Sequence, residues 1–193
     1  MKIWIDIKNS HEPLFFKSIM KHFNQYSYQV TTRDFAEVVS LLERYKIRHD
    51  VIGKRPEGFI LKRHLGFLAR TLHLLVGVPE YDIAMNHNSV WSICAAKMRK
   101  KKIIVFNDND INPIFSKYLP FVDHLISPIS IDTNYYKKIG LKDNSLVQFD
   151  GFKEDIYIAD YKPDDKFLEE LPFEDFVAIR MPNAEILGIR WRN

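Results

Sequence analysis

Short runs of β-branched and aromatic residues alternate along the chain with longer stretches in which apolar residues recur every three or four positions. The short runs are typical of strands, and the longer stretches are typical of helices that lay one face on a sheet. This alternation indicates repeated strand–helix–strand units, so we predict an α/β fold with a Rossmann-like parallel sheet flanked by helices. Seven strands are expected, at 3–7, 28–32, 50–53, 83–86, 103–107, 124–127 and 146–149. Six helices are expected between them, at 13–24, 35–45, 61–75, 90–99, 113–121 and 133–138.

Polar residues mark where several of these helices begin. Asp34, Ser89 and Asp132 each precede a predicted helix, where a short polar side chain can cap the first free amides. Pro113 occupies a first-turn position, where its missing N–H costs nothing.

The pattern changes after residue 151, and this change divides the chain. Residues 1–151 are predicted to form an N-terminal Rossmann-like domain, and 152–175 a polar, aromatic interdomain linker with a short helix at 167–171. A strand at 176–180 then opens the 176–193 stub of a truncated second Rossmann-like domain. Because a lone strand cannot bury its own faces, we expect this stub to be poorly ordered or to pack on another surface.

Composition narrows the class of protein. With 46% apolar and 27% charged residues and a net charge of +3, the chain has the balance of a soluble globular protein and no sign of nucleic-acid binding. The basic run at 97–102 falls at a predicted helix end, where it acts as a solvated cap. The lone Cys94, the absence of room for a signal sequence and the absence of a membrane span favour the cytoplasm.

Parallel strands bring their carboxyl ends to one edge, so the loops that follow them should share a crevice. The loop after the first strand lacks both the GxGxxG fingerprint and a phosphate-binding Gly-Lys-Ser/Thr sequence, so we expect no nicotinamide, flavin or other cofactor. The loop after the fourth strand contains His87, an imidazole able to exchange protons near neutral pH. A structural role for His87 is about equally well supported.

The loop after the fifth strand carries two acids, Asp108 and Asp110, whose spacing would suit a hard cation. Asx side chains also organise turns and cap helices, and we favour that interpretation. No bound metal is therefore predicted.

The helix predicted at 61–75 mixes basic and large apolar residues. Such a helix can lie on an anionic membrane surface. We favour the alternative in which its Leu and Phe side chains pack on the sheet while Lys62, Arg63 and Arg70 stay in water.

Three segments resemble a known family. They are Ile3–Asn9 (IWIDIKN), Val105–Asn109 (VFNDN) and Gly151–Tyr157 (GFKEDIY) with the Lys-Pro-Asp at 162–164. Together they resemble the archaeal and bacterial family of domain of unknown function 354, over nearly the whole chain up to Arg180. That family is similar to two-domain glycosyltransferases of the B fold and to non-hydrolysing UDP-N-acetylglucosamine 2-epimerases. The Gly-x-Lys-Glu-x-x-Tyr phrase is the most specific match.

The resemblance implies the N-terminal, acceptor-side half of a nucleotide-sugar enzyme, inactive without its missing half, with a nucleotide-sugar or sugar acceptor as its ligand. Either a separate gene encodes the C-terminal half as a partner, or the chain is a truncated or frame-shifted product. The catalytic candidates are His87 or His11 as general base, with Asp108. The substrate-binding candidates are Asn9, Ser10, Asn86, Ser89, Asn107, Asn109, Gly151, Lys153 and Glu154. The alternatives are a noncatalytic binding or assembly module and, third, a peripheral membrane component acting on a lipid-linked sugar.

Overall fold

The structure is a computed structural model that describes residues 1–54, 60–109, 113–159, 161–162, 164–172, 177 and 179. The chain divides into two compact units, residues 1–160 and residues 161–193.

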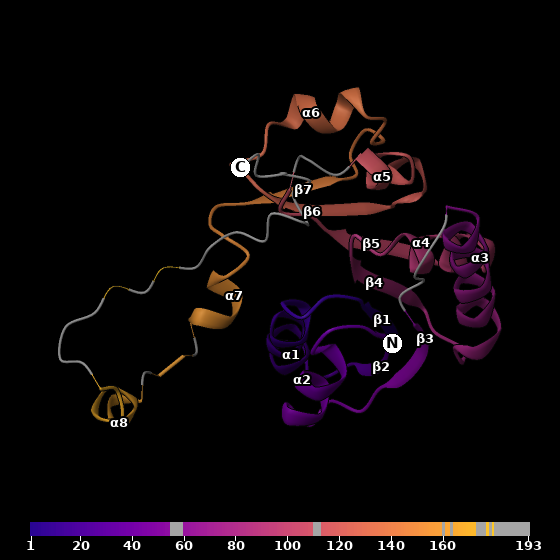
Figure 1. The fold of residues 1–193 in the computed structure, drawn as a ribbon. Helices are drawn as coiled ribbons and strands as arrows, with labels where there is room; N and C mark the ends of the chain where they lie inside the picture. Colours follow the sequence, from indigo (N-terminus) through magenta and orange to yellow (C-terminus); the bar gives the residue numbers. More distant parts are fainter. Residues whose placement is uncertain are drawn as a thin grey trace, which may run out of the picture. The chain divides into compact units, whose positions relative to one another are not determined.

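The first unit is built on one parallel sheet of seven strands, as predicted (Figure 1). All seven predicted strands are confirmed, with ends that differ by at most two residues. The strands are β1 (Lys2–Ile7), β2 (Ser27–Asp34), β3 (Asp50–Lys54), β4 (Ile83–His87), β5 (Lys102–Phe106), β6 (His124–Pro128) and β7 (Leu146–Phe149). Their order across the sheet is β3-β2-β1-β4-β5-β6-β7.

Helices cover both faces of this sheet, and each face has its own apolar core. On one face, α1 (Glu12–His22) and α2 (Val38–Arg44) pack on β1 and β2 through Phe15, Phe16 and Leu42, and α7 (Asp155–Ile158) lies against α1. On the other, α3 (Ile60–Gly77) and α4 (Val90–Met98) pack over Trp4 and Ala84. The helices α5 (Pro113–Ser116) and α6 (Thr133–Lys138) continue this second layer over β5 and β6.

Two predicted helices differ from those observed. The helix predicted to follow Asp34 begins only at Val38 with Glu37 as its N-cap, because Asp34 extends β2 and Ala36 has a positive φ of 48°. The helix predicted at 113–121 splits into α5 and a 3₁₀ turn at Leu119–Phe121. Pro120 explains the break, since a proline removes an N–H and disfavours the helical conformation of the residue before it.

Three predicted helix starts are confirmed: α5 begins at Pro113, and α4 and α6 follow Ser89 and Asp132, of which only Asp132 caps with its side chain. The Asp132 carboxylate accepts a hydrogen bond from the amide of Asn134 at 2.9 Å. Ser89 stands at the N-cap of α4, but its hydroxyl donates to the Asp6 carboxylate instead of capping an amide.

The second unit contains one described helix, α8 (Asp165–Glu169), which lies two residues earlier than the helix predicted at 167–171. The strand predicted at 176–180 lies outside the described residues except for Val177 and Ile179, which are exposed. The proposed boundaries of linker and stub therefore stay predictions.

Candidate functional site

Strand order identifies the place where a ligand should bind. From β1 the chain moves outward to β2 and β3, then crosses back to place β4 on the other side of β1. In open parallel sheets, a crevice forms outside the carboxyl ends of the two strands where the order reverses. Here those strands are β1 and β4, so the loops beginning at Lys8 and Asn88 flank the crevice, and the loop after β5 adjoins them.

At this edge a histidine, an aspartate and a lysine from three different segments meet. His87 Nε2 lies 3.2 Å from Asp108 Oδ1, and the Lys153 ammonium donates a short hydrogen bond to Asp108 Oδ2. His87 and Lys153 are buried, while Asp108 retains partial exposure. Lys153 precedes α7, so the segment after the last strand folds back to place a cation beside the loop of β5.

The loop after β1 adds a second imidazole and a buried carboxylate. The His11 and His87 rings pack edge to face with centroids 5.3 Å apart. Glu12, in the first turn of α1, is fully buried and accepts hydrogen bonds from the Lys8 amide at 2.7 Å and from Asn9 Nδ2 at 2.9 Å. Glu12 thus folds the loop back onto itself and holds His11 against the end of β4.

Burial and neighbouring charges set the protonation of these groups. Desolvation, assisted by the nearby His87 and Lys153, lowers the pKa of His11 to about 4, so its imidazole is neutral at pH 7. Burial opposes ionisation of Asp108, but its contacts with His87 and Lys153 outweigh burial and hold its pKa below the usual range. Although burial disfavours the charged form of Lys153, the bond to Asp108 keeps the pKa of that ammonium raised.

A chain of neutral polar side chains continues from this site beneath β5 and β6. Asn88 Nδ2 donates to Asn107 Oδ1 at 2.6 Å, and Asn107 Nδ2 donates to the Tyr136 hydroxyl at 2.7 Å. That hydroxyl also bonds Ser127 Oγ at 2.7 Å, and Asn107 Nδ2 contacts the carbonyl oxygen of Asn109 at 2.8 Å. These bonds fix the loops after β4 and β5 to each other and to α6.

Three consecutive residues at the end of β4 each leave one buried polar atom without a hydrogen bond among the described residues. The atoms are Asn86 Nδ2, His87 Nε2 and Asn88 Oδ1. The contact of His87 with Asp108 is close but not aligned as a hydrogen bond. Asn88 also adopts a positive φ of 56°, which is uncommon for a residue other than glycine. Unsatisfied buried polar groups are costly, and such groups together with backbone strain gather at ligand sites.

A second buried network lies on the α3 face, and its carboxylate is fully satisfied. Asp6 accepts two hydrogen bonds from the Arg70 guanidinium, at 2.7 and 3.1 Å, and one each from Thr31 Oγ1 at 2.7 Å and Ser89 Oγ at 2.5 Å. Arg70 also stacks on the Trp91 ring at 5.0 Å. The prediction that Arg70 stays in water is therefore wrong, because the residue turns inward to pair with a carboxylate that its sequence position did not reveal.

Most of the predicted site residues lie together at the carboxyl edge. Contacts join the loops that hold Asn9, His11, Asn86, His87, Ser89, Asn107, Asp108 and Lys153. Glu154 reaches to within 3.6 Å of the Lys153 ammonium, and Gly151 has a positive φ of 140° that only glycine adopts readily. Ser10 is exposed, and Asp110 lies outside the described residues.

Sequence reasoning missed several participants. They are Lys8, Glu12, Ser127 and Tyr136. Lys8 follows β1 directly, and its ammonium donates to the carbonyl oxygen of Asn88 at 3.0 Å. Its position after a strand was a usable signal, whereas nothing in the sequence placed Tyr136 under β5.

One group of side chains has the composition of a metal site. The ligand atoms of His11, Glu12 and His87 all lie within 4.8 Å of one another. Two imidazoles and a carboxylate suit zinc or a similar ion. The ammonium groups of Lys8 and Lys153 lie close by and oppose a further positive charge.

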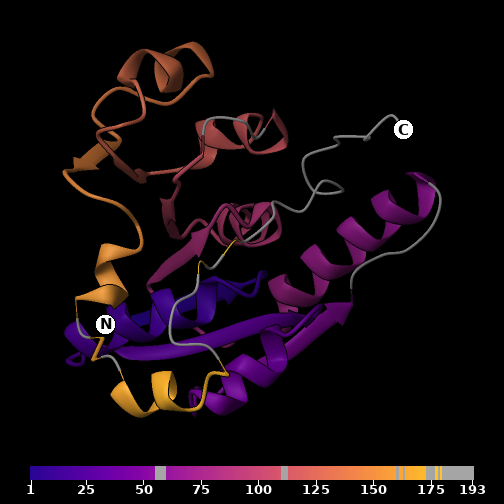
Figure 2. The ribbon, with the colours of Figure 1, turned by 60° about the vertical axis from the view of Figure 1, so that its left-hand side comes forward.

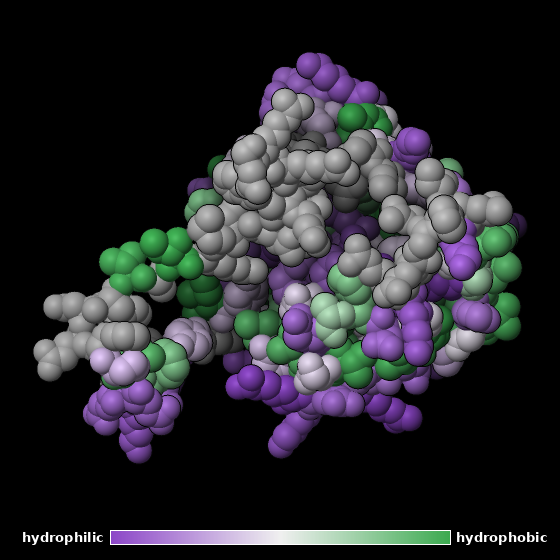
Figure 3. All heavy atoms as spheres, viewed as in Figure 1, coloured by the Kyte–Doolittle hydropathy of each residue, from purple (hydrophilic) through white to green (hydrophobic). Residues whose placement is uncertain are grey.

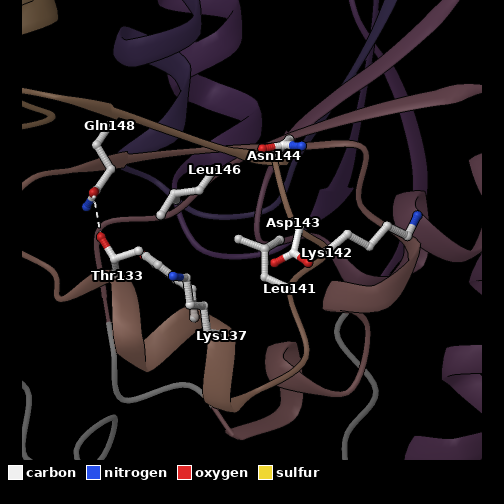
Figure 4. Close-up of a pocket in the computed structure, with 9 residues that line it drawn as sticks. Thr133, Lys137, Leu141, Lys142, Asp143, Asn144, Leu146 and Gln148 are labelled. Atoms are coloured by element: carbon white, nitrogen blue, oxygen red, sulfur yellow. Dashed lines mark hydrogen bonds between the residues drawn. The ribbon is translucent and has the colours of Figure 1, made fainter.

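The larger of two cavities does not lie at the cluster of His87, Asp108 and Lys153. The cavity bordered by His87, Asp108 and Lys153 has a volume of about 10 Å³, room for about one water molecule. A larger cavity of about 440 Å³ lies between α6 and β7 (Figure 4). Its lining residues are Thr133, Tyr136, Lys137, Leu141, Lys142, Asp143, Asn144, Leu146 and Gln148. The His87, Asp108 and Lys153 side chains therefore border only the smaller of the two cavities.

The parallel strand order and the polar edge at its switch point define a Rossmann-like α/β protein. Residues 1–185 match the family described as "Protein of unknown function (DUF354)", and the chain belongs to that family. One relative is an uncharacterised protein of Methanocaldococcus jannaschii, 29% identical over 157 residues, which are 78% of this chain and 45% of the relative. The chain thus spans less than half the length of this relative.

Solved structures share the fold over about half of their length. HepE of Anabaena in complex with UDP-glucose has a TM-score of 0.60 at 16% identity, over 79% of this chain and 44% of HepE. The UDP-GlcNAc 2-epimerase of Methanocaldococcus jannaschii has a TM-score of 0.62 at 11% identity, over 81% and 47%. The enzyme of Neisseria meningitidis bound to UDP-GlcNAc scores 0.62 at 11% identity, over 82% and 49%. At these identities the likeness shows the fold alone.

Among the described residues, no helix is both long enough and apolar enough to cross a membrane.

Proposed function

We propose that this chain is the N-terminal, acceptor-side half of a nucleotide-sugar-dependent enzyme of the B fold, a glycosyltransferase or a 2-epimerase-like protein. The observation that carries the proposal is the set of unsatisfied polar atoms on Asn86, His87 and Asn88. Sugars present many hydroxyl groups that donate and accept hydrogen bonds, and such groups would satisfy these atoms. Solved structures of the same fold, described as complexes with UDP-glucose or UDP-GlcNAc, support this class of ligand.

For glycosyl transfer, the acceptor hydroxyl oxygen would attack the anomeric carbon of the donor sugar. The bond from that carbon to the diphosphate would break, and the diphosphate would leave with the electron pair. The proton of the acceptor hydroxyl would pass to an imidazole, either His87 or His11. His11 suits this role because its lowered pKa keeps it neutral at pH 7, although a pKa of about 4 makes it a weak base.

Asp108 would act by holding His87 in position. Its lowered pKa keeps it ionised, so it would orient His87 and stabilise the imidazolium that forms when the ring takes a proton. Lys153 would hold Asp108 in place through the other carboxylate oxygen. Of the other predicted binding residues, Asn9 would orient a sugar hydroxyl from the loop after β1, whereas the Ser89 hydroxyl is already bonded to Asp6 and the Asn107 amide to Asn88 and Tyr136.

The chain would be inactive alone, because the solved proteins are about twice the length of the part it matches. In two-domain enzymes of this class, a second domain would supply contacts to the nucleotide. Titration of the purified chain with glucose, GlcNAc, UDP, UDP-glucose and UDP-GlcNAc in a calorimeter tests the proposal. We expect weak binding of at least one sugar-containing compound.

Variants locate that binding. His87→Gln should lower the association constant at least about tenfold, a loss typical of removing a buried hydrogen-bonding partner of a ligand. His124→Gln is the matched control, because His124 is exposed at the opposite, amino-terminal end of β6. Equal binding by both variants would place the ligand elsewhere. No binding of any compound by the unaltered chain would favour the noncatalytic binding or assembly module.

A further inference from the structure

The outward face of α3 carries an apolar stripe that nothing in the described part of the chain covers. Leu65, Leu68, Leu72 and Val76 are each between 44% and 83% exposed. At 3.6 residues per turn, their spacing of three, four and four positions confines them to about 80° of the helix circumference. The stripe is defined here as these four residues. Figure 3 shows hydrophobic side chains gathered over α3, with hydrophilic ones among them.

This stripe is not the face that holds α3 on the sheet. The inward face consists of Arg70, Thr71 and Leu74, all buried, and Arg70 is bonded to Asp6. The prediction that the leucines of this helix pack on the sheet is therefore wrong for the three leucines of the stripe, because the helix turns Arg70 and Leu74 inward instead. Figure 2 shows that the amino-terminal end of α3 projects beyond the body of the sheet. An aliphatic row in such a position is the kind of patch that marks an interaction surface.

The charges of α3 favour an anionic partner. None of its 18 residues is acidic, and the exposed Lys62 is followed in sequence by an arginine at 63. Two copies of the chain packed through the stripe would bring no carboxylate of either helix to these cations. A lipid surface with anionic headgroups would supply that negative charge and also accept the leucines, as it does for amphipathic interfacial helices.

The geometry points to α3 as a membrane-surface helix, and we propose that it binds anionic lipid through the stripe, with Lys62 at the headgroups. The stripe extends over about 17 Å along the axis at 1.5 Å per residue. Its aliphatic side chains would enter the boundary between headgroups and acyl chains. This inference does not depend on the sugar-nucleotide function, because none of the stripe residues belongs to the carboxyl edge.

Vesicle flotation tests the proposal directly. The full chain is mixed with vesicles of phosphatidylcholine alone or of phosphatidylcholine and phosphatidylglycerol in equal parts. We expect binding to the anionic vesicles that weakens as salt is raised. Leu68→Asp should reduce that binding at least about tenfold, because it places a charge on the apolar face. Lys62→Gln should reduce it about fivefold, the effect of one basic residue near an anionic surface.

Ile129→Asp is the matched control, because Ile129 is similarly exposed but follows β6, away from α3. Circular dichroism of each variant checks that it is folded. Absence of binding by the unaltered chain, or equal binding by the Leu68 and Ile129 variants, would overturn the proposal. Light scattering gives the competing outcome: a dimer that Leu68→Asp converts to a monomer would mean that a second copy covers the stripe.

Discussion

The two buried carboxylate networks of the first unit differ in how completely they are satisfied. Asp6 is fully buried and receives four hydrogen bonds, two of them from Arg70. Asp108 is partly exposed, and its neighbour His87 keeps a ring nitrogen without a hydrogen bond among the described residues. A saturated network stabilises the fold and leaves no capacity for a ligand, whereas an unsatisfied one costs stability and retains that capacity. This contrast separates a saturated carboxylate network from one that keeps unsatisfied polar atoms in the same sheet.

The most severe test of the contrast is Asp6→Asn. Removing one partner of a buried ion pair leaves the other charge uncompensated, so we expect the free energy of unfolding to fall by about 3–5 kcal/mol. Urea denaturation followed by circular dichroism measures it. Asp34→Asn, at an exposed carboxylate 3.9 Å from Lys54, is the matched control and should leave the unfolding curve unchanged. A similarly small effect at Asp6 would remove the distinction between the networks.

Tyr136→Phe tests the neutral chain that links the two loops to α6. The substitution removes a buried hydroxyl bonded to Asn107 and Ser127 and leaves both without that partner. A loss of about 1–3 kcal/mol in unfolding free energy is expected. Tyr26→Phe is the control, since Tyr26 is only partly buried and the loss of its hydroxyl should cost little. Equal losses in the two variants would contradict a role for the Asn107 chain in stability.

His11 makes the stability of the carboxyl edge sensitive to acid. The pKa of His11 is about 4 in the folded protein against an ordinary value of 6.5, so the unfolded chain binds the proton more readily. The contribution of neutral His11 to the free energy of unfolding is therefore fully present above pH 6.5. It is lost as the pH falls from 6.5 toward 4. His11 is 44% exposed, so solvent screening reduces this contribution to about 1 kcal/mol.

His11→Gln should remove this part of the acid sensitivity. Between pH 7 and pH 4.5, the variant should lose about 1 kcal/mol less unfolding free energy than the unaltered chain, as measured by urea titrations at both pH values. His124→Gln, at an exposed histidine, should follow the unaltered chain. Parallel pH profiles for all three proteins would show that His11 titrates normally.

The smallest effect on stability is expected at His87. His87→Gln removes a ring nitrogen that has no hydrogen bond within the described part of the chain. The unfolding free energy should therefore change by about 1 kcal/mol or less, although the residue is as deeply buried as Arg70. Thermal unfolding measures it alongside the sugar titrations. A loss as large as that of Asp6→Asn would mean that His87 belongs to the structural group.

The sequence predicted the secondary-structure elements and the residues of the candidate site to different extents. The β-branched strands and the apolar spacing of α1 were readable because a strand or helix needs a regular pattern to bury one face. The residues after β1, β4 and β5 were identified as neighbours because parallel strands end at one edge. The delayed start of α2 was not predicted, since Asp34 has the chemistry of a cap but the backbone turns at Ala36.

The sequence by itself determined the α/β class, the seven strands and the edge where His87 and Asp108 meet, because periodicity and chain direction are local properties. Only the tertiary structure decided that Arg70 pairs with Asp6, that Lys153 returns to Asp108, and that Leu68 faces outward. Each of these depends on the rotation of a helix or the path of a loop, and 64 or 45 residues separate the first two pairs. Packing of side chains across the whole sheet sets those rotations, and no short stretch of sequence contains that information.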